Sequence, residues 1–227
     1  MKILSYSDIG VRRKDNQDNF WCARLEVNGD ECGVLCVCDG MGGLNDGGLA
    51  SGMVIKAVRE AILSSSDLEV LKSVLPRVNT EVFNKGAESG KRMGTTCTLL
   101  RCSKGKYEIL HIGDSRCYRF HDGEVSVLTK DHSAIAKYGI SKEENPELYR
   151  KHKNQLTRCI GVKPDIDVDY ITGDYSSGDK FLVCSDGFWH YFDSDTGILD
   201  KGTLKDAVDA CISNGETDNI TIGVLEV

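Results

Sequence analysis

Four aspartates stand where predicted strands begin or end, and a carboxylate is costly to bury there. Asp39 and Asp186 each close an apolar run, while Asp114 and Asp218 lie beside two further β-like segments. A buried carboxylate has a large desolvation cost unless positive charge meets it. If these strand ends converge, they form a cage of hard oxygen ligands that one or two divalent cations would satisfy.

Two of these aspartates are followed by glycine, in Asp39-Gly40 and Asp186-Gly187. Glycine allows close backbone approach, so the Gly40 carbonyl can also serve as a ligand. A single Asp-Gly step is more commonly a turn, but two that each close an apolar run favour a metal site. The all-oxygen ligand set suits Mg²⁺ or Mn²⁺ better than Zn²⁺.

A pair of such cations lowers the pKa of a bound water and holds a reacting phosphoryl group. A guanidinium would then hold the remaining phosphate oxygens bidentately. Arg13 is the candidate, because Asp18 follows it closely in the segment 10–18. The alternative for Arg13 is an exposed basic turn, which is the commoner fate of an Arg-Arg-Lys run.

The elements that must position these residues read as two groups of strands, each followed by amphipathic helices. An Asn28-Gly29 turn predicts a hairpin, and Pro76 weakens or kinks the second helix. We predict strands over 3–9, 20–27, 34–39, 95–101, 107–112, 116–120, 125–128, 166–171, 180–184 and 220–227, helices over 49–62, 68–83 and 203–212, and a flexible loop over 42–48. Residues 133–156 are polar and predict a mobile or helical insertion over one end of the sheet. The fold class is α+β, a layered sandwich.

The composition excludes several classes of protein. The 227 residues fit one domain, and the net charge of −7 argues against a nucleic-acid partner. No apolar stretch is long enough to span a membrane, and the first residues lack the apolar core of a signal peptide. Five of the ten cysteines lie in apolar runs and no Cys-x-x-Cys pair exists, which argues against disulfides and zinc. These features predict a cytoplasmic protein.

The order of the motifs resembles the metal-dependent serine/threonine protein phosphatases of the type 2C (PPM) family, in their short bacterial form. The matching stretches span nearly the whole chain and are, in order, Gly10…Arg13…Asn16-Gln17-Asp18, Val37–Gly43, Gly94-Thr95-Thr96, Ile112–Arg116, Leu128–Ser133, Leu156-Thr157-Arg158, Ser185-Asp186-Gly187 and Asp218-Asn219.

The resemblance implies one catalytic domain over 1–227, a four-layer α-β-β-α sandwich with two central antiparallel sheets. It implies two Mn²⁺ or Mg²⁺ ions and a metal-bridged hydroxide that attacks phosphorus directly. By this resemblance Asp39 bridges both ions, the Gly40 carbonyl binds one of them, and Asp186 and Asp218 bind the other. Gln17 and Asp18 orient metal-bound waters, and Arg13 binds the phosphate. Asp114 binds a weak third ion. Residues 133–156 correspond to the family's flap, which influences substrate choice.

Two positions depart from the family pattern. Met41 stands where many eukaryotic members carry a histidine that is a proposed general acid, so water must protonate the leaving group here. His190 stands where many members carry an aspartate of the third-ion site. The third site is therefore expected to be weak or absent.

The resemblance further implies a monomer that dephosphorylates phosphoserine and phosphothreonine in proteins, reversing a bacterial Hanks-type kinase. One alternative is a pseudophosphatase that binds phosphoproteins without turnover. Another is a metal-dependent hydrolase of a different phosphoester, which the ligands alone do not exclude.

Overall fold

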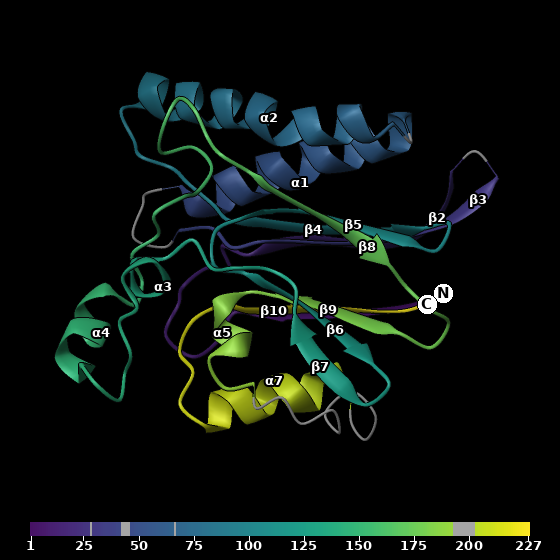
Figure 1. Cartoon of the computed structure of the whole chain (residues 1–227). Coiled ribbons are helices and arrows are strands. Elements are labelled where there is room, and N and C mark those ends of the chain that lie inside the picture. The colour runs from purple at the N-terminus through teal and green to yellow at the C-terminus, as the bar shows by residue number, and fades with distance from the viewer. Residues whose placement is uncertain (28, 42–45, 66, 193–202) are drawn as a thin grey trace.

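Two five-stranded antiparallel sheets stack face to face, and helices cover their outer faces (Figure 1). This is the arrangement in a computed structural model that describes residues 1–27, 29–41, 46–65, 67–192 and 203–227. The predicted four-layer α-β-β-α sandwich is confirmed. Both chain ends lie close together at one end of the sandwich (Figure 1).

The first sheet has the strand order β1-β10-β9-β6-β7, and the second has the order β2-β3-β4-β5-β8. The strands of the first sheet are β1 (Lys2–Asp8), β10 (Ile220–Glu226), β9 (Lys180–Cys184), β6 (Arg116–His121) and β7 (Glu124–Val127). Those of the second are β2 (Asn19–Val27), β3 (Asp30–Cys38), β4 (Cys97–Ser103), β5 (Lys106–Ile112) and β8 (Asp169–Asp174).

Each sheet has its own helical cover. Helices α1 (Gly47–Ser64) and α2 (Leu68–Ser89) lie over the second sheet, and α5 (Asp186–Trp189) and α7 (Leu204–Ser213) lie over the first (Figure 1). Three apolar clusters fill the spaces between the four layers. None of the helices in the described part of the chain has the length and apolar character needed to cross a bilayer.

Strand β3 is buried on both faces because it lies at the centre of this stack. Leu35 and Val37 face the first sheet, while Cys36 and Cys38 pack in the cluster beneath α1 and α2. The alternation follows from the two-residue period of a strand. It explains why residues 34–38 are continuously apolar and why the strand ends at Asp39, the first charged side chain after that run.

Two predicted helix boundaries are wrong. Helix α2 continues through Pro76 to Ser89, beyond the predicted end at residue 83. Its buried residues, such as Leu75 and Val78, pack against the α1 layer, and this burial outweighs the hydrogen bond that proline cannot donate. Helix α1 starts at Gly47, inside the loop predicted over 42–48, and residues 42–45 of that loop lie outside the described residues.

The strand predicted over 166–171 is displaced. The observed strand β8 is Asp169–Asp174, because pairing with β5 sets its register, from His111 opposite Asp169 to Lys106 opposite Asp174. Ile166 and Val168 instead pack against the core beneath α1 and α2. Their apolar character comes from that packing and not from a place in the sheet.

The segment 133–156 makes a closed excursion with two short helices, α3 (Ala134–Tyr138) and α4 (Pro146–His152). A β-bridge between Ser133 and Leu156 closes its base. The backbone N–H of Ala134 donates to Gln155 at 2.7 Å across the same base. The segment projects to one side of the sandwich (Figure 1).

Candidate active site

The carboxylate of Asp39 is presented by a tightly bonded strand end. Its backbone N–H donates to Thr96 Oγ1 at 2.9 Å, and its carbonyl accepts from the Thr96 N–H at 2.9 Å and from Thr95 Oγ1 at 2.8 Å. Thr95 and Thr96 immediately precede β4, so the pairing of β3 with β4 is extended by these contacts. The backbone of Asp39 is thereby fixed.

Gly40 brings the segment before β2 against this strand end. Its N–H donates to the Gln17 carbonyl at 3.2 Å, and a Cβ at this position would lie 2.4 Å from that same oxygen. Only glycine fits so close an approach. Asp18 follows Gln17 directly, so this contact places a second acidic residue beside Asp39.

The amide of Asn219 joins three separate segments of the chain. Its Oδ1 accepts from the Gln17 N–H at 3.0 Å, and its Nδ2 donates to the Ile9 carbonyl at 2.8 Å. Gly10, at φ +72°, lies so close to Asp218 that a Cβ would be 2.0 Å from the Asp218 carbonyl oxygen. The sequence suggested no such role for Asn219, which holds the first loop against the turn that carries Asp218.

The carboxylates converge closely enough to alter one another's ionisation. Burial raises the pKa of Asp39 well above its usual value, and four carboxylates raise it further, those of Asp18, Asp186, Asp114 and Asp218. Burial also raises the pKa of Asp186, while His190 and a hydrogen bond with Asp39 lower it. Because neighbouring carboxylates repel one another when ionised, this set of aspartates requires compensating positive charge.

Asp18 shows this requirement most clearly. It is 6% exposed, and neither of its carboxylate oxygens has a hydrogen-bond partner among the described residues. Burial raises the pKa of Asp18 to about 7; the nearby hydroxyls of Thr221 and Ser185 lower it without making well-directed hydrogen bonds. The Oε1 atom of Gln17 is also buried without a partner. Buried oxygens without a hydrogen-bond partner are suited to bind a divalent cation directly or to accept hydrogen bonds from its waters.

Asp218 differs from the other acids because an arginine meets it. Arg13 donates from Nε to Oδ1 at 2.7 Å and from Nη2 to Oδ2 at 2.5 Å. The hydrogen bond with Asp218 raises the pKa of Arg13, and the charges of Asp39 and Asp186 raise it further. Arg13 therefore lies at the acidic centre, and in this structure its guanidinium holds a carboxylate; its binding of phosphate stays a prediction.

Asp114 reaches the centre from the loop after β5, and its backbone is held by Trp189. The Trp189 indole donates to the Asp114 carbonyl at 2.8 Å. The guanidinium of Arg116 lies 3.5 Å above the Trp189 ring and forms a bidentate ion pair with Asp131. Burial raises the pKa of Asp114, and the charge of Asp186 raises it further.

His190 follows α5, which begins at Asp186. Its Nδ1 lies 3.3 Å from Glu216 Oε2. The other Glu216 oxygen accepts from the backbone N–H groups of Thr217 and Asp218, at 2.6 and 2.8 Å. Glu216 therefore shapes the turn that presents Asp218. No pattern in the sequence indicated its contact with His190, because that contact joins separate elements.

The residues predicted for the site thus come together at one end of the sandwich. They arrive from five separate segments of the chain and are Arg13, Asp18, Asp39, Gly40, Asp114, Asp186 and Asp218. Within the part of the chain that the structure describes, these buried and half-buried carboxylates outnumber the cationic side chain that meets them, Arg13, and such a set suits hard divalent cations.

Comparison with known proteins agrees with this arrangement. A family model described as protein phosphatase 2C matches residues 11–219. The serine/threonine phosphatase stp of Listeria monocytogenes serotype 4b (strain F2365) is 29% identical over 240 residues, covering 97% of this chain and 93% of that protein. Protein phosphatase PhpP of Streptococcus pneumoniae (strain D39) is 29% identical over 246 residues, covering 100% and 98%.

Solved structures show the same fold. PppA, a regulatory component of T6SS in Pseudomonas aeruginosa, superposes with a TM-score of 0.83 at 27% identity, covering 99% of this chain and 96% of that chain. The catalytic domain of the serine/threonine protein phosphatase PstP, in complex with 2 manganese ions, superposes with a TM-score of 0.82 at 25% identity, covering 98% and 96%. The match of the family model over nearly the whole chain, together with these relatives, shows that the chain belongs to the protein phosphatase 2C family and is a metal-dependent protein serine/threonine phosphatase.

Proposed function

We propose that residues 1–227 act as one catalytic domain whose acidic centre binds two divalent cations, Mn²⁺ or Mg²⁺. The observation that carries the proposal is the buried Asp18 carboxylate without a partner, beside acids that raise one another's pKa. The charges of the other four acids all act on Asp39, which would bridge the two ions. The Gly40 carbonyl would complete one ion's shell, and Asp186 and Asp218 would bind the other.

Bound cations supply an activated water nucleophile and neutralise the charge on the phosphoryl group. The protein side chains then have distinct tasks. Gln17 and Asp18 accept hydrogen bonds from water and orient it, since their oxygens are free to do so. Arg13 holds phosphate oxygens with the same two N–H groups that now hold Asp218.

A third, weaker ion would bind at Asp114. The carboxylate that many family members add to this site is absent, since His190 occupies the position and contacts Glu216. An imidazole is a poorer ligand than a carboxylate for Mg²⁺ or Mn²⁺. The third site is therefore proposed to fill only at high metal concentration.

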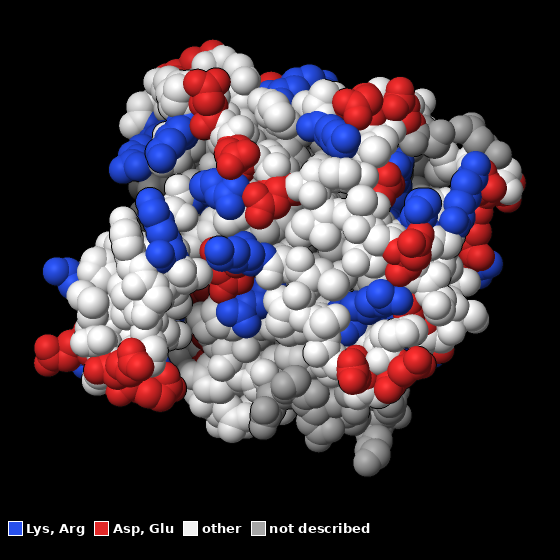
Figure 2. Space-filling model, in the orientation of Figure 1, with Lys and Arg blue, Asp and Glu red and all other residues white. Residues whose placement is uncertain are grey.

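The substrates are proposed to be proteins phosphorylated by a bacterial Hanks-type serine/threonine kinase, acted on by a monomer. The flap over 133–156 directly follows His132, whose backbone N–H donates to the Gly113 carbonyl, and it is proposed to influence which phosphoproteins enter. Figure 2 shows Lys and Arg interspersed with Asp and Glu over the viewed face, which gives no support to a nucleic-acid partner. All ten cysteines are free, which supports a reducing compartment such as the cytoplasm.

The pseudophosphatase alternative has no observation in its favour. A protein that had lost turnover would be expected to have lost part of the acidic set or the arginine, and Asp39, Asp186, Asp218 and Arg13 are all present. The relatives are protein phosphatases, which also disfavours a hydrolase of a different phosphoester.

The test is hydrolysis of p-nitrophenyl phosphate and of a phosphothreonine peptide with Mn²⁺, with Mg²⁺ and with excess chelator. Asp39→Asn and Asp186→Asn should each lower kcat about a thousandfold or more, since ~4 kcal/mol of barrier corresponds to that factor. Asp174→Asn is the matched control, because Asp174 is an exposed residue at the end of β8 that forms an ion pair with Lys106 of β5. Turnover that persists in excess chelator would refute the proposed metal site.

A further inference from the structure

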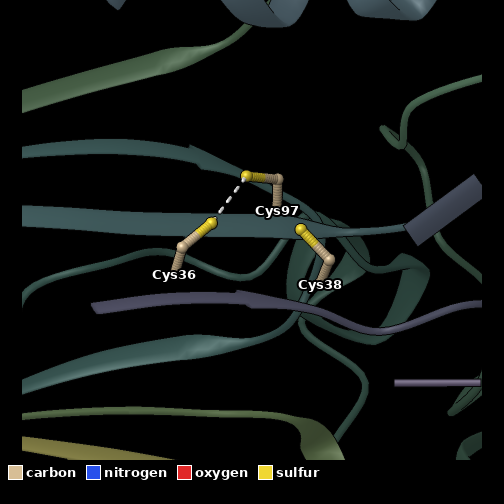
Figure 3. Close-up of side chains that lie close together, drawn as sticks. All are labelled: Cys36, Cys38 and Cys97. Atoms are coloured by element: carbon tan, nitrogen blue, oxygen red, sulfur yellow. Dashed lines mark hydrogen bonds between the residues drawn. The ribbon is translucent and has the colours of Figure 1, made fainter. Parts of the chain in front are cut away.

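Three buried thiols form a compact group directly behind the strand end that carries Asp39 (Figure 3). Cys36 and Cys38 come from β3 and Cys97 begins β4. Their Sγ atoms all lie within 4.8 Å of one another, and those of Cys36 and Cys97 are 4.0 Å apart. Among the described residues this is the one group of three candidate metal-ligating side chains that is so compact.

Strand register brings the three sulfurs together. Val37 pairs with Thr98 in the antiparallel ladder, so the next pair along the strands is Cys38 opposite Cys97. Cys36 and Cys38 point to the same face of β3 because side chains alternate along a strand. The sulfurs therefore share one face of the sheet, beneath α1 and α2.

One sulfur–sulfur distance in the group equals that of a three-coordinate ligand shell, and the other two are at most 4.8 Å. A thiolate–metal bond is about 2.3 Å long, and three sulfurs around a planar three-coordinate ion then lie about 4.0 Å apart. The observed Cys36–Cys97 distance of 4.0 Å matches this value. A disulfide would require about 2.05 Å, and all three cysteines are free.

The chemistry of the group selects a soft cation. Hydrogen bonds from Cys36 and Cys38 lower the pKa of Cys97, whereas burial raises the pKa of Cys38, so Cys97 is the thiol of the three that is most readily deprotonated. Thiolate ligands favour Cu(I), Zn²⁺ and other thiophilic ions over Mg²⁺ or Mn²⁺. Zn²⁺ requires a fourth ligand in its usual tetrahedral sites, whereas three sulfurs complete a trigonal shell for Cu(I).

We propose that Cys36, Cys38 and Cys97 form a three-sulfur site for one thiophilic cation of the Cu(I) class, separate from the oxygen-lined centre. The site lies where the two strands that position Asp39 meet. Cys38 precedes Asp39, and Cys97 follows Thr96, which is bonded to the Asp39 backbone. A bound ion therefore ties together the two strand ends behind the phosphatase centre.

The test is an anaerobic competition for Cu(I) between the reduced protein and a chromogenic Cu(I) chelator, with Mg²⁺ in excess to saturate oxygen ligands. The full chain should withdraw one Cu(I) from the chelator and develop sulfur-to-copper charge-transfer absorption in the ultraviolet. Each of Cys36→Ala and Cys97→Ala should weaken binding beyond the roughly 10- to 100-fold typical of an outer-shell change.

Cys102→Ala is the matched control, because Cys102 is an equally buried cysteine of β4 that faces the other sheet. It should bind Cu(I) as the unmodified chain does. Failure of the unmodified chain to compete overturns the proposal, and this arm does not depend on the folding of any variant. Equal affinity in Cys36→Ala and Cys97→Ala, with native circular dichroism, also overturns it.

Discussion

Arg13 and Asp218 are 205 residues apart in the sequence and form a bidentate ion pair in the structure. The same guanidinium is proposed to hold phosphate, and the same carboxylate is proposed to bind a cation. Each partner therefore neutralises the other's charge when neither ligand is present. Both side chains are partly exposed, at 38% and 31%, so the pair can exchange partners without unfolding its surroundings.

Arg13→Ala is expected to raise KM for a phosphopeptide about 10- to 100-fold, because a hydrogen-bonded charged contact contributes about 1.5–3 kcal/mol. The Mn²⁺ concentration at half-maximal activity should stay the same or fall, since Asp218 loses a competitor for the cation. Steady-state kinetics at several Mn²⁺ concentrations measures both quantities. Arg12→Ala, at the exposed neighbouring position, is the control. A weaker response to Mn²⁺ in Arg13→Ala would place Arg13 in a structural role.

Asp18→Asn is expected to be more stable than the unmodified chain without metal and less stable than it with metal. Without metal the variant should be more stable by about 1–3 kcal/mol, because an amide replaces a buried carboxylate that has no partner. With excess Mn²⁺ the unmodified chain should become the more stable one, since a bound ligand stabilises the folded state in proportion to its affinity. Thermal unfolding with and without Mn²⁺ measures the crossover. Parallel gains in both proteins would show that Asp18 does not contribute to metal binding.

His190→Asp is expected to strengthen the site at Asp114, because a carboxylate is a better ligand for Mn²⁺ than an imidazole. The change also removes the contact of His190 with Glu216, so a modest loss of stability is expected. Isothermal titration with Mn²⁺ should show an additional or tighter binding event. His152→Asp in α4, away from the acids, is the control. An unchanged titration would contradict the assignment of the third site.

Trp189→Phe should lower the free energy of unfolding by about 1–2 kcal/mol. It removes the hydrogen bond to the Asp114 carbonyl, and the smaller ring interacts less strongly with Arg116. Urea unfolding measures the change. Trp21→Phe is the natural comparison, since Trp21 is the other tryptophan and packs against the core beneath α1 and α2. Similar losses of unfolding free energy in both variants would show that Trp189 contributes through packing alone.

His111 is expected to make the protein acid-sensitive. Burial lowers its pKa from 6.5 to about 4, and its ring nitrogens are bonded to Thr98 and the Lys130 carbonyl. Between these two values the unfolded chain binds a proton at His111 that the folded chain does not, so the contribution of His111 to stability falls as the pH falls. The contribution is about 2 kcal/mol between roughly pH 7 and pH 5.

Urea unfolding at both pH values tests this expectation. His111→Asn should be less stable near pH 7 but should lose less stability on acidification. His152→Asn, on the flap, should retain the full pH dependence of the unmodified chain. An equal slope in His111→Asn and the unmodified chain would show that other groups are responsible.

Local patterns in the sequence predicted the strands, the layered class and the types of residue in the site. The apolar run before Asp39, the glycine at position 40 and the hairpin around β2 and β3 depend on neighbours in the chain, so periodicity and turn chemistry reveal them. The family resemblance supplied the roles that are proposed for the individual acids. The ends of α2 and β8 were wrong because burial against α1 and pairing with β5 decided them.

Contacts between distant segments were decided only by the tertiary structure. The pairing of Arg13 with Asp218, the bonds that Asn219 makes to the first loop and the meeting of Cys97 with Cys36 and Cys38 all depend on how the sheets align. The sequence determined that acids and thiols would stand at the ends of buried strands, because local hydrophobic patterning sets where strands stop. Strand register and sheet packing decide which of these side chains meet. Both depend on contacts made along the whole chain, so no short stretch of sequence reveals them.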